Sequence, residues 1–292
     1  MRKVLRFIPE LIAIILFLVY MIPFALILIN AAKPTLQILV DPLAMPERFS
    51  LLFENIMEVY SSPNVQYPSA FMASAIITTI SCGMLVLISS MAAWVLVRTK
   101  TKLSNAIFMM FVAAMIIPFQ VVMFPLIAWF FRVESLLGLR DIAGGSFRLL
   151  SNYPGMILAY MGFGSSLSIF LYHGFIKTVP LELEEAAMID GASKAGTFFK
   201  IVFPILKPIT MTVIILNGIW IWNDFLLPML VLGAFGGVQT LPLAVNSFVG
   251  SFSKKWDLIL TAALMVMTPA IIVFLFLQKY IMKGMVDGSV KG

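Results

Sequence analysis

The stretch KTVPLELEEAAMIDGASKAGTFFKIVFPILK, residues 177–207, is a polar segment within a strongly apolar chain. Eight of its 31 residues are charged, about a quarter, against 12% of the whole chain. It lies between the apolar runs 149–172 and 208–232. Each run exceeds the roughly 20 residues that a helix needs to cross a bilayer. We interpret the stretch as a loop between two membrane spans, and a loop of this length usually has a structure or function of its own.

Long apolar runs continue on both sides of this loop. Of the 292 residues 61% are hydrophobic, and the mean hydropathy is +1.02. A soluble domain is nearer half apolar and a quarter charged, so a soluble enzyme and a disordered chain are both excluded. The six runs are 11–32, 71–97, 103–131, 149–172, 208–232 and 258–278. In lipid each must be a helix, because its backbone polar groups have no other partners. The sequence predicts an all-α integral membrane protein with six transmembrane helices.

Two of the runs need comment. The run 11–32 follows a basic start like that of a signal peptide, but its 22 uncharged residues exceed a usual signal core. We therefore expect a retained first helix. The run 103–131 is interrupted by Pro118 and Pro125, so we expect it to be kinked or to leave the membrane in part.

The basic residues predict the orientation of the chain. If the N-terminus is cytoplasmic, 13 of the 20 Lys and Arg residues lie in cytoplasmic segments and seven lie outside. Cytoplasmic loops of membrane proteins carry such an excess, so both termini are expected in the cytoplasm. The same bias accounts for the net charge of +6, which then requires no nucleic-acid partner.

Residue counts exclude some chemistry within this chain. The single cysteine, Cys82, allows no intrachain disulfide. With one histidine as well, a Cys/His metal site cannot be assembled. We expect that histidine, His173, to be a satisfied residue at the inner end of the fourth span.

The loop 177–207 is expected to form two short helices. Pro180 suits the first position of one helix, and carboxylates in its first turn favour the positive end of the helix dipole. Gly191 would end that helix. Ser193 would cap a second helix, which we expect to end before Pro204. An alternative is an amphipathic hairpin lying on the membrane surface.

The residues of this loop resemble a known motif. Glu185-Ala186-Ala187, Gly191 and Ile201-Val202-Phe203-Pro204 match the EAA loop of binding-protein-dependent ABC importer permeases, with Phe203 in place of a leucine. Three further stretches resemble the carbohydrate branch of that family, the maltose and multiple-sugar type. They are LELEEAAMIDGAS (181–193), WNDFLLP (222–228) and KGMVDGSVKG (283–292).

The resemblance implies a type I ABC importer permease fold and a set of partners. These are a second homologous permease subunit, two ABC ATPase subunits, an extracytoplasmic solute-binding protein, membrane lipid and a sugar. The ATPase contacts would be Glu184, Glu185, Ala186, Ala187, Asp190 and Gly191. The C-terminal residues Gly288, Lys291 and Gly292 would make a second contact, although Met285-Val286-Asp287 departs from the Leu-Thr-Ala usual there.

The chain itself is not expected to hydrolyse ATP. Its nearest match to a phosphate-binding loop, Gly191 to Gly196, lacks the Lys-Ser/Thr pair that holds phosphate and Mg²⁺. ATP and Mg²⁺ would therefore be bound by the partner ATPase, with no cofactor in this chain.

We expect three regions along the chain. Residues 1–70 form the first span and a long outside loop, whose residues 33–70 favour a docking surface over a tether. Residues 71–281 form the five-helix core with the coupling loop 177–207, and residues 282–292 form a cytoplasmic tail. The last outside loop, 233–257, is expected to be flexible by its composition. The resemblance implies that it reaches into the binding protein.

Four residues are candidates for the translocation pathway. Asp224 is the only carboxylate inside a predicted span, where a charge costs roughly 2.5–3.5 kcal/mol and so requires a partner or water. With Asn223 it would line a pore, or it could cap a helix or bond between helices. Pro118 and Gln120 could present free backbone groups and an amide to a sugar, or mark a simple kink. Trp220 and Trp222 are expected to be interfacial anchors.

The resulting hypothesis is a pore-forming, non-catalytic subunit of an ATP-driven sugar importer in the bacterial cytoplasmic (inner) membrane. The same kind of permease for glycerol phosphate or a polysaccharide fragment is an alternative. An ion-coupled secondary transporter would need several intramembrane ionisable residues and usually inverted repeats. The sequence has one such carboxylate and no evident repeat.

Overall fold

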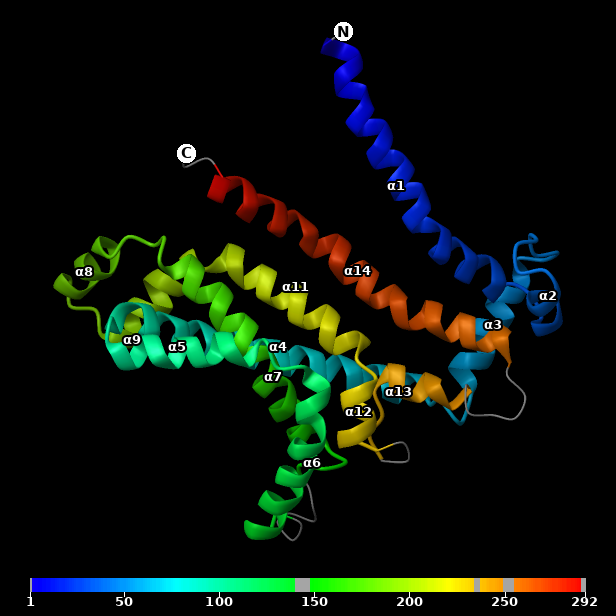
Figure 1. Ribbon diagram of the computed structural model, residues 1–292. Helices are drawn as coiled ribbons and strands as arrows, with labels where there is room; N and C mark the ends of the chain where they lie inside the picture. Colours follow the sequence, from blue (N-terminus) through cyan, green and yellow to red (C-terminus); the bar gives the residue numbers. More distant parts are fainter. Residues whose placement is uncertain (1, 140–147, 234–236, 249–254, 290–292) are drawn as a thin grey trace. The chain divides into compact units, whose positions relative to one another are not determined.

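The computed structural model describes residues 2–139, 148–233, 237–248 and 255–289 (Figure 1). Those residues form helices and no strands, which confirms the predicted all-α class. The chain divides into two compact units. One unit comprises residues 1–70 and 241–269, and the other comprises residues 71–240 and 270–292.

Five helices in the described ranges are long and apolar enough to cross a membrane. They are α1 (Arg2–Ala31), α4 (Tyr67–Thr99), α6 (Phe119–Leu136), α7 (Tyr153–Ile176) and α14 (Trp256–Ser289). A sixth results if the segment Lys194–Ile205 and α11 (Lys207–Asn223), which meet at a bend of 75°, count as one span. The integral membrane fold with five or six spans agrees with the sequence, while the side on which the termini lie stays a prediction.

The apolar run 103–131 is two helices rather than one kinked span. Its first part is α5 (Lys102–Ala114), and α6 begins at Phe119. Pro118 is the N-cap residue of α6, with φ −59° and ψ 128°. A proline disfavours helical geometry in the residue before it, which is consistent with the non-helical residues between the end of α5 at Ala114 and the start of α6. Pro125, by contrast, lies inside α6.

The run 208–232 is also divided. Helix α11 ends at Asn223, Asp224 is extended with ψ 130°, and α12 (Leu226–Val231) follows. The expectation that Asp224 lies inside a continuous span is therefore wrong. It lies at the break between two helices.

The unit formed by residues 1–70 and 241–269 contains α2 (Thr35–Val40), α3 (Ser50–Ser61), α13 (Leu241–Val245) and the 3₁₀-helix η3 (Asn246–Phe248). Its buried centre joins Val59 to Leu258 and Ala262. Residues 241–248 are helical, where composition had suggested a flexible loop; Gly236 and Gly250 of that loop lie outside the described residues.

Polar contacts join distant parts of this unit. Lys33 is fully buried, and its Nζ donates to Asn30 Oδ1 and to the carbonyls of Asp41 and Pro42 at 3.1–3.2 Å. On the surface, Lys255 Nζ donates to Glu58 Oε1 at 2.9 Å, and this bond raises the pKa of Lys255. Apart from Asn30, which lies in the predicted first span, the residues of both contacts lie in segments that were predicted as outside loops.

The unit formed by residues 71–240 and 270–292 has a core between α4, α5, α7 and α11. The buried apolar cluster of this core extends into the loop 177–207. Its members are Val86, Ala93, Val97, Phe108, Ile169, Tyr172, Ile176, Val179, Phe198, Val202, Leu206 and Val213. Hydrogen bonds join α7 to α11 inside the core: Tyr172 Oη donates to Thr210 Oγ1 at 2.9 Å, and Asn217 Nδ2 donates to Ser168 Oγ at 3.1 Å.

Candidate functional site

The loop 177–207 contains four short helical segments. They are α8 (Glu182–Ile189), α9 (Lys194–Thr197), the π-helix η2 (Phe198–Val202) and α10 (Phe203–Ile205). Three glutamates lie in the first turn of α8, as the dipole argument predicts. Gly191 has φ +85°, a left-handed conformation that favours glycine, and Ser193 Oγ accepts from Gly196 N as the N-cap of α9. The predicted helix stop and cap are both confirmed.

Two details of the predicted loop are wrong. Pro180 precedes α8, which begins at Glu182, so it is not the first helical residue. The second helix also passes through Pro204 and ends at Ile205. A proline has no N–H for the usual helical bond, and its ring crowds the carbonyl one turn earlier. The wider π-turn of η2, in which Phe203 N donates to Phe198 O, lies directly before the proline and changes the hydrogen-bond register there.

Glu184 points into the protein and holds α8 against α4. Its side chain is 4% exposed, and Arg98 donates to its Oε1 from Nε at 2.9 Å and from Nη2 at 2.7 Å. Trp94 Nε1 donates to Oε2 at 2.9 Å. Arg98 Nη2 also reaches the carbonyl of Val179 at 3.1 Å. Both carboxylate oxygens are therefore bound within this chain, and we call Trp94, Arg98 and Glu184 the anchor.

Sequence reasoning did not find Trp94 and Arg98. They lie 90 and 86 positions before Glu184, and no local spacing relates residues that far apart. A basic residue at the inner end of a span is ordinarily explained by topology alone.

The opposite face of α8 is exposed. Glu185 and Ala186 lie on it, and Ile189 is 86% exposed. Positions 182, 185, 186 and 189 share one side of a helix, because residues three and four apart are neighbours. Asp190 is exposed as well, and Ala187 is half-buried. The structure thus brings Glu185, Ala186 and Asp190 to one surface and turns Glu184 away from it.

The remainder of the loop is packed into the core. Phe198, Val202 and Leu206 are buried within the same cluster as residues of α4, α7 and α11. The Trp94 ring of the anchor lies 5.2 Å from the Phe198 ring, centroid to centroid. The loop 177–207 is therefore attached to the spans through a polar contact of α8 and an apolar contact of η2.

The candidate pathway residues lie around an aromatic cluster. Phe119, between Pro118 and Gln120, lies 6.1 Å from the Trp220 ring, which lies 5.4 Å from the Tyr160 ring. Trp220 thus packs among aromatic rings as well as lying near the end of α11. Gln120 is exposed beside this cluster.

The carboxylate of Asp224 is hydrogen-bonded within the chain, to Tyr160 and to the backbone that begins α12. Its Oδ2 accepts from Tyr160 Oη at 3.0 Å, and its Oδ1 accepts from Leu226 N at 3.0 Å, which caps α12. The neighbouring Asn223 is exposed and donates to the carbonyl of Ile219 in its own helix. The capping and interhelical bonds that the sequence left open for Asp224 are both present.

The structure says less about the predicted C-terminal contact and about His173. Gly288 lies near the end of α14, and Lys291 and Gly292 lie outside the described residues. His173 is buried and stacked on Phe108 at 3.6 Å between ring centroids. The described part of the chain holds no group of three or more His, Cys, Asp or Glu side chains that could bind a metal ion.

Comparison with known proteins gives matches over most of the chain. Residues 84–287 match the family described as binding-protein-dependent transport system inner membrane component. The chain is 36% identical, over the full length of both proteins, to a probable starch degradation products transport system permease protein, AmyC, of Thermoanaerobacterium thermosulfurigenes. It is 39% identical to the melibiose/raffinose/stachyose import permease protein MelC of Bacillus subtilis, covering 82% of this chain and 81% of MelC.

The fold has also been seen in a solved structure. A chain of a bacterial ABC transporter involved in the import of the acidic polysaccharide alginate superposes with a TM-score of 0.70, covering 95% of this chain and 96% of that one. The two share 16% sequence identity, so the likeness concerns the fold alone.

Proposed function

Since this chain belongs to the family of binding-protein-dependent transport system inner membrane components, we propose that it forms half of the pore of an ATP-driven importer for a sugar or oligosaccharide. In this proposal a second, homologous permease subunit forms the other half. Two ATPase subunits bind ATP and Mg²⁺ and supply the work, and an extracytoplasmic binding protein delivers the solute. The chain itself is a non-catalytic membrane subunit.

The observation that carries the proposal is the division of α8 into two faces. One face is fixed to the chain through Glu184, whose carboxylate accepts three hydrogen bonds. The other face presents Glu185, Ala186 and Ile189, which is 86% exposed. A helix with an apolar side chain and a small residue on its free face suits a groove on a partner protein. We assign this face to the ATPase subunit.

The anchor and the buried core explain how movement of α8 would reach the pore. A displacement of α8 acts on α4 through Arg98 and on α7 and α11 through Phe198 and Val202. Packed cores move as rigid bodies rather than deform continuously. Closure of the ATPase dimer would therefore shift these spans together.

The class of solute is inferred from the relatives. The names of AmyC and MelC refer to starch degradation products and to melibiose, raffinose and stachyose. All are carbohydrates, and melibiose, raffinose and stachyose each contain more than one sugar unit. We propose a sugar or oligosaccharide for this chain, with the surface near Gln120 as a place where it passes.

Glu185→Lys tests the assignment of the docking face. The assembled transporter, reconstituted with its ATPase, second permease and binding protein, should lose at least tenfold in sugar uptake and in binding-protein-stimulated ATP hydrolysis. The reason is that a reversed charge would meet the groove of the ATPase. The variant should still insert and keep its melting temperature, because Glu185 is exposed.

Lys194→Glu is the matched control, a charge reversal at another exposed residue of the same loop, on α9. It should reduce uptake less than twofold. If Glu185→Lys bound the ATPase at full yield and transported at the normal rate, the docking face would be wrongly assigned.

A further inference from the structure

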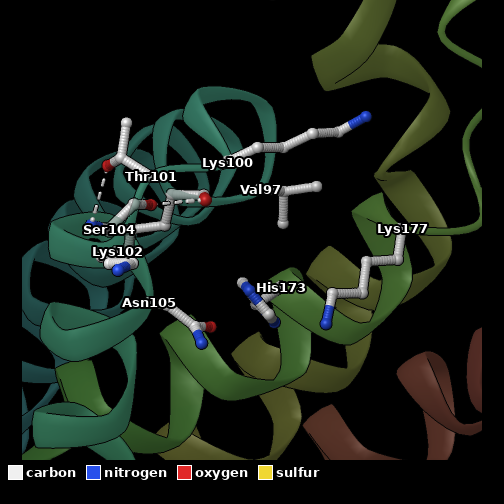
Figure 2. A pocket seen from close by; sticks show the side chains of 9 residues that line it. Val97, Lys100, Thr101, Lys102, Ser104, Asn105, His173 and Lys177 are labelled. Atoms are coloured by element: carbon white, nitrogen blue, oxygen red, sulfur yellow. Dashed lines mark hydrogen bonds between the residues drawn. The ribbon is translucent and has the colours of Figure 1, made fainter.

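A pocket lined by three lysines lies near the anchor, where α4 and α7 end and α5 begins. Its volume is about 350 Å³, within the usual range of small-ligand sites. Figure 2 shows side chains around it, from the α4–α5 turn and from the end of α7. The lining residues are Leu96, Val97, Lys100, Thr101, Lys102, Ser104, Asn105, His173 and Lys177.

The charge of the pocket is positive. Lys100, Lys102 and Lys177 line it, and no acidic residue does. None of these lysines forms an ion pair with any residue in the ranges that the structure describes. The Nζ of Lys177 lies 6.0 Å from the centroid of the Phe108 ring. Figure 2 shows the three ammonium groups around the pocket and apart from one another, and a bound anion would attract all three.

Lys102 gives a second reason to expect an anion. It is the first residue of α5, whose first turn holds no acidic residue. The N-terminus of a helix carries a partial positive charge, so a lysine there is unfavourably placed. Lys100 and Lys177 follow the C-terminal ends of α4 and α7, where lysines are favourable, but Lys102 is not explained in this way.

Hydrogen bonds hold the α4–α5 turn beside the pocket in a defined conformation. Thr101 caps α5 by accepting from Ser104 N at 3.1 Å, and Ser104 Oγ donates to the carbonyl of Leu96 at 2.6 Å. These bonds fix the turn that carries Lys100 and Lys102. On the other side, the His173 ring is stacked on Phe108.

An apolar stripe on α5 leads away from the pocket. Leu103, Ile107 and Met110 are 70%, 37% and 71% exposed and share one side of the helix by their spacing. Since α4 and α7 are spans that end at the pocket, the pocket lies at the membrane surface and the stripe extends toward the lipid. A basic pocket between spans, next to an apolar stripe, has the chemistry of a phospholipid headgroup site.

We propose that this pocket binds the phosphate of an anionic phospholipid, whose acyl chains lie along Leu103, Ile107 and Met110. Lys100, Lys102 and Lys177 would pair with the phosphate. Asn105, which is exposed beside Lys102, would bond to a neutral headgroup oxygen.

Native mass spectrometry of the full chain in mild detergent tests the proposal. Phosphatidylglycerol is the probe, and phosphatidylcholine is the zwitterionic comparison. One phosphatidylglycerol should stay bound to each copy of the chain at concentrations where phosphatidylcholine does not. The triple variant Lys100→Gln/Lys102→Gln/Lys177→Gln should bind it at least tenfold more weakly. All three lysines are exposed, so the variant should keep its fold and its melting temperature.

The matched control removes three exposed lysines elsewhere in the loop, Lys194→Gln/Lys200→Gln/Lys207→Gln, and should keep the lipid. Equal loss in both triple variants would show general surface attraction and overturn the proposal. So would equal retention in the pocket variant. If inorganic phosphate occupied the pocket while phosphatidylglycerol did not, the ligand would be a soluble anion and the lipid assignment would fail.

Discussion

Arg98 and Glu184 form an ion pair that is largely shielded from water, with side-chain exposures of 18% and 4%. Arg98→Met should lower the free energy of unfolding by about 3 kcal/mol, because it leaves a buried carboxylate with Trp94 as its main donor. The melting temperature in detergent measures this loss. Hydrogen exchange of α8 should rise at the same time, since the helix loses its attachment to α4.

The double variant Arg98→Met/Glu184→Met distinguishes the contribution of the ion pair to stability from that of apolar packing around it. Removing both charges should recover much of the lost stability, since a buried pair is often replaceable by apolar residues. If the double variant were as unstable as the sum of the single ones, the two residues would not act as a pair.

Gly155 is required for a close approach within the core. A Cβ added there would overlap the backbone carbonyl of Leu149, whereas a Cβ on Gly162 of the same helix meets nothing within 4 Å. Gly155→Ala should cost about 1–3 kcal/mol of stability through steric overlap. Gly162→Ala should be neutral or stabilising by up to about 1 kcal/mol, because alanine favours the helix. Unfolding of both variants in detergent decides the comparison, and equal effects would contradict it.

Residues that act locally were predictable from the sequence, and residues that act across the fold were not. Gly191 and Ser193 were found from their own neighbours, because helix stops and caps depend on adjacent residues. The inward direction of Glu184 was not found, since it depends on Arg98. Tyr160 was missed for the same reason, because its bond to Asp224 joins residues 64 positions apart.

Helix α8 depends on its turn at Gly191. Gly191→Pro should reduce sugar uptake at least tenfold, because proline fixes φ near −65° and this turn needs +85°. Proline would also remove the bond from Gly191 N to the carbonyl of Met188. Uptake by reconstituted vesicles is the measurement.

Gly191→Asn is the control at this position, since asparagine tolerates the left-handed conformation better than other side chains do. It should keep most of the uptake. Loss of uptake in the asparagine variant to the level of the proline variant would show that the side chain, and not the turn, is the cause.

At the scale of elements, apolar runs predicted where helices occur but not where they break. The run 103–131 contains two prolines, and only Pro118 separates two helices. The break at Asp224 was missed because the sequence is equally apolar on both sides of it. The extended backbone there is stabilised by the hydrogen bond that the Asp224 carboxylate accepts from the first turn of α12. The length and composition of an apolar run therefore do not determine where its helix breaks.

The whole molecule should depend on ATP and not on an ion gradient. In proteoliposomes that hold the assembled transporter, uptake should require ATP on the ATPase side and should continue when a protonophore abolishes the proton gradient. The reason is that, in the proposed function, the loop 177–207 receives the work of ATP hydrolysis and no intramembrane carboxylate couples uptake to an ion. Uptake by this chain alone, driven by an ion gradient, would instead support a secondary transporter.

The grouping of residues 241–269 with the first seventy was beyond the reach of the sequence. It rests on contacts between distant positions, such as Thr261 Oγ1 to the carbonyl of Ala31 at 3.3 Å and Tyr67 Oη to that of Met265 at 3.3 Å. Periodicity describes one element at a time and does not state which elements meet. The all-helical membrane class, by contrast, follows from composition and needs no pairing.

The anchor should also affect the rate and the affinity with which α8 binds the proposed ATPase subunit. Because Trp94 and Arg98 already hold α8 in place, little conformational entropy would be lost on binding of the proposed ATPase subunit. Ordering a flexible side chain at an interface costs about 0.5–1.5 kcal/mol, and a preorganised helix avoids much of that cost. Association should therefore resemble the docking of two rigid bodies, with a rate set by diffusion and orientation instead of by folding.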